Sequence, residues 1–174
     1  MSADVTSEEE VIAAAVASGT DAIAVPAELV SDEQPAPSSL LQRLPSMTVA
    51  ERIKLALRGN REARMHLLRD PNRLIRRFVL QNPRIGDEEI IALAKNRSAD
   101  DELLRLIADS REWAKNYQIR IALVTNPKTP IALALRFVSS LGDRDVRALA
   151  KSKNVPNAVA AAAKRIVLMK GDRR

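Results

Sequence analysis

Short segments with a helical spacing of apolar residues alternate with polar breaks from residue 47 onward. Apolar side chains recur every three or four positions, and each segment spans about three helical turns. The pattern predicts eight or nine helices and no sheet in residues 47–174. The expected helices lie at about 48–58, 62–69, 72–81, 87–94, 100–108, 111–125, 130–140, 143–152 and 156–169.

Capping residues and prolines indicate where several of these helices begin and end. Thr48, with Glu51 three residues later, has the pattern of a capping box. Asn82-Pro83 and Asn126-Pro127 each end a helix, because a residue before proline is disfavoured in the helical conformation. Thr129-Pro130 supplies an N-cap followed by proline at the first helical position. These signals favour an all-α fold.

The sequence repeats itself at a spacing of 44 residues. Ile75-Arg76 aligns with Ile119-Arg120, and Asn82-Pro83-Arg84 aligns with Asn126-Pro127-Lys128. Short helices that recur with the same stop signals predict stacked helical hairpins, in which each unit buries its apolar face against the next. We therefore expect a short, curved α-solenoid.

The run from Ile119 to Leu135 resembles the leucine-rich-repeat-variant pattern. In that pattern a helix that opens with Val/Ile-Arg ends at Asn-Pro, and Thr-Pro and a leucine-rich helix follow. Residues 75–94 match in part, with Gly86-Asp87 in place of Thr-Pro, and the spacing elsewhere is closer to HEAT-like repeats. The sequence lacks the cysteine cluster that some variant-repeat proteins carry. The resemblance implies an α-helical repeat fold and a binding role, and it implies no chemistry.

The first 46 residues differ from the rest in composition and charge. They hold eight acids and one base, a net charge of −7, and are rich in Ala, Ser and Pro. Because few large apolar side chains are available to offset the entropy of ordering, residues 1–46 are predicted to form a disordered tail. Residues 1 to about 38 are expected to lack packed tertiary contacts. Ser7 followed by three glutamates is an exception, since it has the pattern of a helix start.

Residues 47–174 form the predicted basic helical-repeat domain, with a net charge of +13. Two pairs of cations occupy equal positions of the repeat, Arg76 with Arg120 and Arg84 with Lys128. Equal positions of a solenoid share a face, so such cations would form a partner-binding surface. The candidate residues are Arg73, Arg76, Arg77, Arg84, Arg120 and Lys128. The alternative is that each cation caps helix carbonyls or pairs with an acid. The acidic tail either shields this face or only keeps copies of the protein apart.

Trp113 and Tyr117 lie four residues apart on one predicted helix, with Arg120 three residues further on. Exposed on one face, the two aromatic side chains would stack on a base or contact a peptide. The alternative is that they anchor the core, as large aromatic residues commonly do.

The sequence contains no cysteine, one histidine and only isolated glycines. Thiol chemistry and a Cys/His metal site are excluded, and no glycine-rich phosphate loop is present. We therefore expect a non-enzymatic protein with no cofactor and no small-molecule substrate. No apolar run approaches the ~20 residues of a membrane span, and no early cation precedes an apolar core. We expect a cytoplasmic protein that does not bind membranes.

The sequence thus predicts an interaction module or scaffold whose basic face binds a protein partner with an acidic surface. The alternative is the binding of duplex DNA or structured RNA through phosphate contacts on the same face. A third hypothesis, a base-excision-type enzyme, has only the loose support of Trp113 near Asp109 and Glu112.

Overall fold

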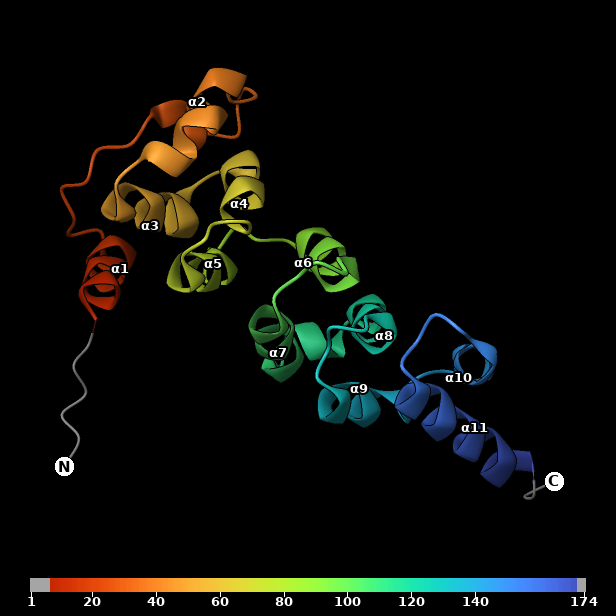
Figure 1. Cartoon of the computed structure of the whole chain (residues 1–174). Coiled ribbons are helices and arrows are strands. Elements are labelled where there is room, and N and C mark those ends of the chain that lie inside the picture. Colours follow the sequence, from red (N-terminus) through yellow and green to blue (C-terminus); the bar gives the residue numbers. More distant parts are fainter. Residues whose placement is uncertain (1–6, 172–174) are drawn as a thin grey trace, which may run out of the picture. The chain divides into compact units, whose positions relative to one another are not determined.

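The structure is a computed structural model that describes residues 7–171 (Figure 1). Every regular element in this range is a helix, so the fold is all-α, as the hydrophobic pattern predicts. The chain divides into two compact units, Met1–Ile85 and Gly86–Arg174. This division falls at residues 85–86, within the predicted helical-repeat domain of residues 47–174.

In unit 1, helices that are two apart along the chain pack against each other. The elements are α1 (Glu8–Ser18), η1 (Ala27–Leu29), α2 (Ser38–Arg43), η2 (Leu44–Ser46), α3 (Val49–Arg58), α4 (Arg61–Leu67) and α5 (Arg73–Leu80), where η marks a 3-10 helix. Helix α1 packs against α3, and α3 packs against α5. Ile53, Leu55, Ile75 and Val79 are fully buried at the centre of this unit.

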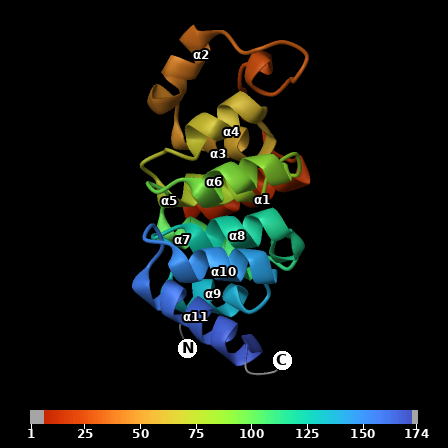
Figure 2. The same cartoon turned by 90° about the vertical axis from the view of Figure 1, so that its right-hand side faces the viewer.

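Unit 2 combines contacts between helices two apart along the chain with contacts between consecutive helices. Its elements are α6 (Asp87–Lys95), α7 (Asp101–Asp109), η3 (Trp113–Lys115), α8 (Tyr117–Thr125), α9 (Ile131–Val138), α10 (Asp143–Lys151) and α11 (Asn157–Gly171). Helix α6 packs against α8, and α9 and α10 both pack against α11. Figures 1 and 2 show α6, α8 and α10 along one side of the unit and α7 and α9 along the other. A continuous solenoid across both units stays a prediction.

One predicted helix, at about 111–125, is in fact two elements. A 3-10 turn ends at Lys115, and α8 begins at Tyr117. The break lies at Asn116, whose backbone is extended and whose Oδ1 atom accepts hydrogen bonds from the amides of Gln118 (2.9 Å) and Ile119 (3.4 Å). An asparagine in this position caps a new helix, so one helical element ends before Asn116 and the next begins after it.

The prediction that residues 1 to about 38 lack packed tertiary contacts is wrong for residues 8–38. Helix α1 starts at the capping box of Ser7 and Glu10, and Val16 on this helix is buried in the core of unit 1. Leu29 and Leu44 are also buried in the same core. Residues 1–6 of the predicted tail lie outside the described residues. The acidic N-terminal segment is therefore part of unit 1 from residue 8 onward.

The 44-residue repeat has a structural counterpart in its two Asn-Pro sequences. Asn82 and Asn126 are both buried, and in each the side-chain amide donates to two main-chain carbonyls at the end of a neighbouring helix. These carbonyls belong to Ala56 (2.9 Å) and Gly59 (3.2 Å) for Asn82, and to Ala94 (2.7 Å) and Asn96 (3.0 Å) for Asn126. Each asparagine therefore fastens the end of its own helix to the end of the helix beside it.

Candidate functional site

Arg76 and Arg120, the first pair of repeated cations, hold the backbone together. Each is half-buried and donates from Nη1 to the main-chain carbonyl six residues earlier, that of Asp70 for Arg76 and that of Ala114 (3.5 Å) for Arg120. The guanidinium of Arg120 also lies 5.5 Å from the centre of the Tyr117 ring, a cation–π distance. In both copies of the repeat the arginine therefore bonds to the segment before its helix. Arg76 and Arg120 thus have a structural role, which was the alternative to partner binding.

The other candidate cations differ in how they are engaged. Arg73 and Lys128 are exposed, and neither side chain has a hydrogen bond or ion pair within residues 7–171. Arg77 is half-buried on α5 and has interactions of its own. Arg84 is exposed but occupied, because its guanidinium forms an ion pair with Asp32 (2.8 Å). Of the second repeated pair, only Lys128 is therefore available to a ligand.

Trp113 and Tyr117 lie on different elements, so the predicted shared helical face does not form. Trp113 is half-buried in η3, and Tyr117 is the first residue of α8. The Tyr117 hydroxyl donates to the carboxylate of Asp145 and accepts a hydrogen bond from the amide of Gly142 (3.0 Å). Tyr117 thus joins α8 to the start of α10, which supports the core-anchor interpretation for this residue.

In unit 1 an extended acidic segment lies against the C-terminal ends of α3 and α5. We call residues 20–37 the N-terminal arm. Asp21 forms an ion pair with Lys54 on α3 (2.7 Å), and the hydrogen bond from Lys54 is the main cause that holds the pKa of Asp21 below its usual range. Leu29 is fully buried at the middle of the arm. The acidic segment therefore docks on basic residues of its own unit, which the sequence analysis left open.

Main-chain carbonyls of the arm supply most of its hydrogen bonds to the unit. Asn60 donates from Nδ2 to the carbonyls of residues 28 (2.9 Å) and 31 (3.0 Å), and its amide donates to the carbonyl of Leu29 (2.7 Å). Arg84 donates from Nη2 to the carbonyl of Val30 (2.8 Å). Four successive carbonyls of the arm are thus satisfied by two side chains and one amide of unit 1.

The corresponding ends of the helices in unit 2 carry exposed cations. We call Lys95, Arg97, Lys128, Lys151 and Lys153 the basic edge. These residues lie at or just after the C-terminal ends of α6, α8 and α10, and all five are exposed. The segments 93–99, 122–129 and 149–155, which contain them, have no Asp or Glu. The edge is therefore a positive surface without acids in its own segments.

A shallow pocket shows that the three helix ends of the basic edge converge. It has a volume of about 170 Å³ and is lined by residues that include Lys95, Arg97, Thr125, Asn126, Ser152 and Asn154. Arg97 donates to the carbonyl of Asn154 (3.3 Å), which connects the end of α6 to the loop after α10. Asn126 connects the end of α6 to that of α8. Lys95 and Arg97 line this pocket, and the other three cations lie within two residues of Asn126 or Ser152, which also line it.

The net charge of the protein is concentrated near its C-terminus. Residues 143–174 hold nine of the 28 basic and three of the 22 acidic side chains, a net charge of +6. Residues 1–142 hold nineteen of each and are neutral as a whole. Arg144, Arg147 and Lys151 are exposed at helical spacing along α10. The α10–α11 hairpin and the loop between its helices therefore carry the positive field of the protein.

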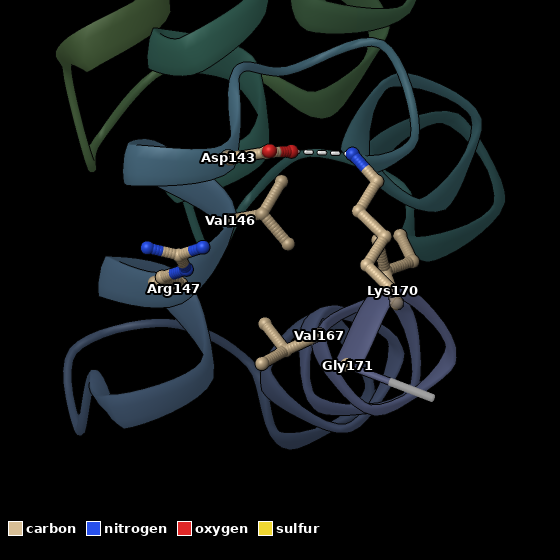
Figure 3. Close-up of a pocket in the computed structure, with 7 residues that line it drawn as sticks. Asp143, Val146, Arg147, Val167, Lys170 and Gly171 are labelled. Carbon is tan, nitrogen blue, oxygen red and sulfur yellow. Dashed lines mark hydrogen bonds and ion pairs between the residues drawn. The ribbon is translucent and has the colours of Figure 1, made fainter. Parts of the chain in front are cut away.

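A second pocket lies between α10 and α11 and has no arrangement of catalytic groups. Its volume is about 190 Å³. Figure 3 shows Val146 and Val167 facing each other across it, with the ion pair of Asp143 and Lys170 at one side. Within the described part of the chain, no group of three or more His, Asp or Glu residues is placed to hold a metal ion. None of the described helices is long and apolar enough to cross a membrane.

Comparison with known proteins finds no matching family model, no similar curated protein and no similar solved structure.

Proposed function

We propose that this protein is a non-enzymatic helical-repeat interaction module that binds a protein partner with an acidic surface. The basic edge of unit 2, together with the exposed cations of α10, is the binding surface. The proposal narrows the surface expected from the sequence, because Arg76 and Arg120 are engaged with the backbone and Arg84 with the N-terminal arm.

The observation that carries the proposal is the uncompensated positive charge of the basic edge. Cations at helix C-termini are stabilised by the helix macrodipole, which accounts for their position. The side chains of Lys95, Lys128, Lys151 and Lys153 form no ion pair within residues 7–171. A partner carboxylate would therefore gain a new ion pair at each of them without breaking an existing one.

Binding of nucleic acid through phosphate contacts is the second candidate function, and the same exposed cations favour it. The two functions differ in salt dependence, because each neutralised phosphate of duplex DNA releases a condensed counterion. An interface with several phosphate contacts loses about a thousandfold or more in affinity between about 50 mM and about 200 mM salt.

The proposal is tested by fluorescence anisotropy with two labelled probes, poly-L-glutamate and a DNA duplex of about 20 base pairs, at both salt concentrations. We expect the full chain to bind poly-L-glutamate more tightly than the duplex at the higher salt. The variant Lys95→Glu with Lys151→Glu is expected to bind poly-L-glutamate about tenfold more weakly, a change of about 1.4 kcal/mol.

The matched control is Arg105→Glu with Arg165→Glu, which changes the net charge equally at exposed residues of α7 and α11. We expect this control to change the affinity about twofold or less, because the cations it removes lie outside the basic edge. Equal losses in the two variants would contradict the assignment of the surface. Tighter binding of the duplex would favour the nucleic-acid function, and binding of neither probe would refute both.

A further inference from the structure

We propose that the basic edge of unit 2 binds an extended acidic peptide segment of a partner protein, in the way that unit 1 binds the N-terminal arm. The inference rests on the proposed function and specifies the form of the ligand. Its starting point is that the chain contains both a bound example of such a segment and a second, uncovered copy of the residues that bind it.

In unit 1 the arm is held by a pair of donors that one buried asparagine brings together. Asn82 donates to the carbonyl of Gly59, the residue before Asn60, and accepts from the amide of Arg84 (2.9 Å). Asn60 and Arg84 are therefore placed side by side, with their side-chain donors toward the arm. Between them they satisfy the carbonyls of residues 28, 30 and 31 and the Asp32 carboxylate.

In unit 2 the equivalent asparagine, Asn126, also connects the end of one helix to the residue two positions after itself. Asn126 donates to the carbonyl of Asn96 (3.0 Å) and accepts from the amide of Lys128 (2.9 Å). In the sequence Asn96 matches Asn60 through a repeated Ala-Leu-x-x-Asn, and Lys128 matches Arg84. The bonded carbonyl differs by one residue, because Asn82 contacts the residue before Asn60 and Asn126 contacts Asn96 itself. The donor pair of unit 1 thus has a counterpart in unit 2, positioned by the same side chain.

The donors of unit 2 have no acceptor among the described residues, whereas those of unit 1 are engaged by the arm. Asn60 is buried beneath the arm, but Asn96 and Lys128 are both exposed. Within residues 7–171 neither the Asn96 Nδ2 atom nor the Lys128 Nζ atom has a hydrogen-bond partner. An amide and an ammonium left without acceptors at a repeated position are suited to the same ligand groups, a main-chain carbonyl and a carboxylate.

The arm also indicates the chemistry of the expected segment. Arg84 contacts a carbonyl and, two residues later, a carboxylate, in the sequence Val30-Ser31-Asp32. Every residue has a backbone carbonyl, so hydrogen bonds to carbonyls add affinity for any sequence. The contact between a carboxylate and the surrounding cations adds selectivity for acidic segments. The expected ligand is therefore an extended or turn-forming peptide with at least one Asp or Glu and accessible carbonyls. A folded acidic surface lacks the accessible carbonyls.

The test measures binding of a labelled synthetic peptide with the sequence of residues 20–36 to the full chain by fluorescence anisotropy. In the full chain the unit 1 site is already covered by its own arm, so we expect the added peptide to bind at unit 2. The variant Asn96→Ala with Lys128→Glu is expected to weaken peptide binding about tenfold or more. The backbone bond that Asn126 makes to residue 96 is retained in this variant, so its helical circular dichroism should equal that of the parent.

The matched control is Arg165→Glu, which changes the net charge by the same amount at an exposed residue of α11. We expect it to weaken peptide binding about twofold or less, and we expect a peptide with Asn in place of Asp32 to bind several-fold more weakly than the parent peptide. Equal losses in the Asn96/Lys128 variant and the control would overturn the inference, as would an unchanged affinity in both.

The inference and the proposed function fail in distinguishable ways. If the peptide does not bind while poly-L-glutamate does, negative charge alone is enough for binding, so the binding mode taken from the N-terminal arm is wrong and the proposed function stands. If neither probe binds, both are wrong. Tighter binding of the DNA duplex than of either acidic probe would assign the surface to nucleic acid.

Discussion

The buried asparagine of unit 2 provides a sharp test of how the repeat is held together. The perturbation is Asn126→Ala, at a residue that exposes only 3% of its surface. The change removes the bonds donated to Ala94 (2.7 Å) and Asn96 (3.0 Å) and the bond accepted from the amide of Lys128 (2.9 Å). Alanine has no polar side-chain atom to replace these bonds.

The expected loss of stability follows from these three bonds. A hydrogen bond contributes about 1 kcal/mol net, and a buried group left without a partner costs about 1–3 kcal/mol. Partial access of water to the pocket beside Asn126 reduces the cost, so we expect Asn126→Ala to lower the free energy of unfolding by about 2–4 kcal/mol. Asn126→Asp should cost at least as much at neutral pH, because a carboxylate would face two carbonyls.

The assay is urea denaturation followed by the fluorescence of Trp113, the only tryptophan of the chain and a residue of unit 2. The control is Asn157→Ala, an exposed residue at the start of α11, for which a change within about 0.5 kcal/mol is expected. A loss below about 0.5 kcal/mol for Asn126→Ala would refute the argument that the Asn-Pro asparagine fastens one helix end to the next.

Three further predictions concern residues whose side chains form hydrogen bonds or ion pairs within the protein. Arg76→Glu with Arg120→Glu should destabilise the protein by at least about 2 kcal/mol in urea, because each loses a bond to a carbonyl; a change within about 1 kcal/mol would instead mark both as surface residues. Arg84→Ala should speed proteolysis within the N-terminal arm in a timed digest, because Arg84 bonds both Val30 and Asp32, and an unchanged rate would contradict its role in holding the arm. The ion pair that lowers the pKa of Asp21 should stabilise the arm fully above pH 3.8 and lose this effect as the pH falls through the lower folded value. Amide exchange in the arm should report that loss, and the Lys54→Met variant should not show it.

The helices of residues 47–171 could be predicted because their signals are local. The Thr48–Glu51 capping box and the Asn-Pro stops act within one turn, and the structure contains both as expected. The break at Asn116 was missed because the apolar stripe continues across it and only the asparagine marks the new start.

The folding of the N-terminal segment could not be predicted from its composition. Its few apolar anchors, such as Val16 and Leu29, are far apart in sequence and are buried by residues of α3 to α5. Its other contacts use main-chain carbonyls, which every sequence possesses, and the donors Asn60 and Arg84 lie about thirty to fifty residues away. Such contacts leave no periodic pattern in the sequence of the segment, so its acidic composition was the only feature from which to predict its behaviour.

The candidate site was predicted in part. In both units the buried asparagine accepts from the amide of the repeated cation, Arg84 or Lys128, yet the repeat gave no sign that an arm engages the first side chain and leaves the second without a partner within residues 7–171. Equal spacing also grouped Arg76 with Arg120, but spacing does not record that both side chains turn back to a carbonyl. The net positive charge of residues 143–174 follows from the sequence alone. Dividing the chain at residue 46 spread this charge over the whole of residues 47–174, so its position near the C-terminus was not seen.

We propose that the basic edge of unit 2 binds an acidic protein segment, and an amide chemical-shift titration of the full chain with poly-L-glutamate would locate the bound surface residue by residue. We expect saturable shift changes that are largest at residues 95–97, 126–128 and 151–154, with small changes in unit 1. Changes that are largest in unit 1, or no saturable change at the three helix ends, would contradict the claim.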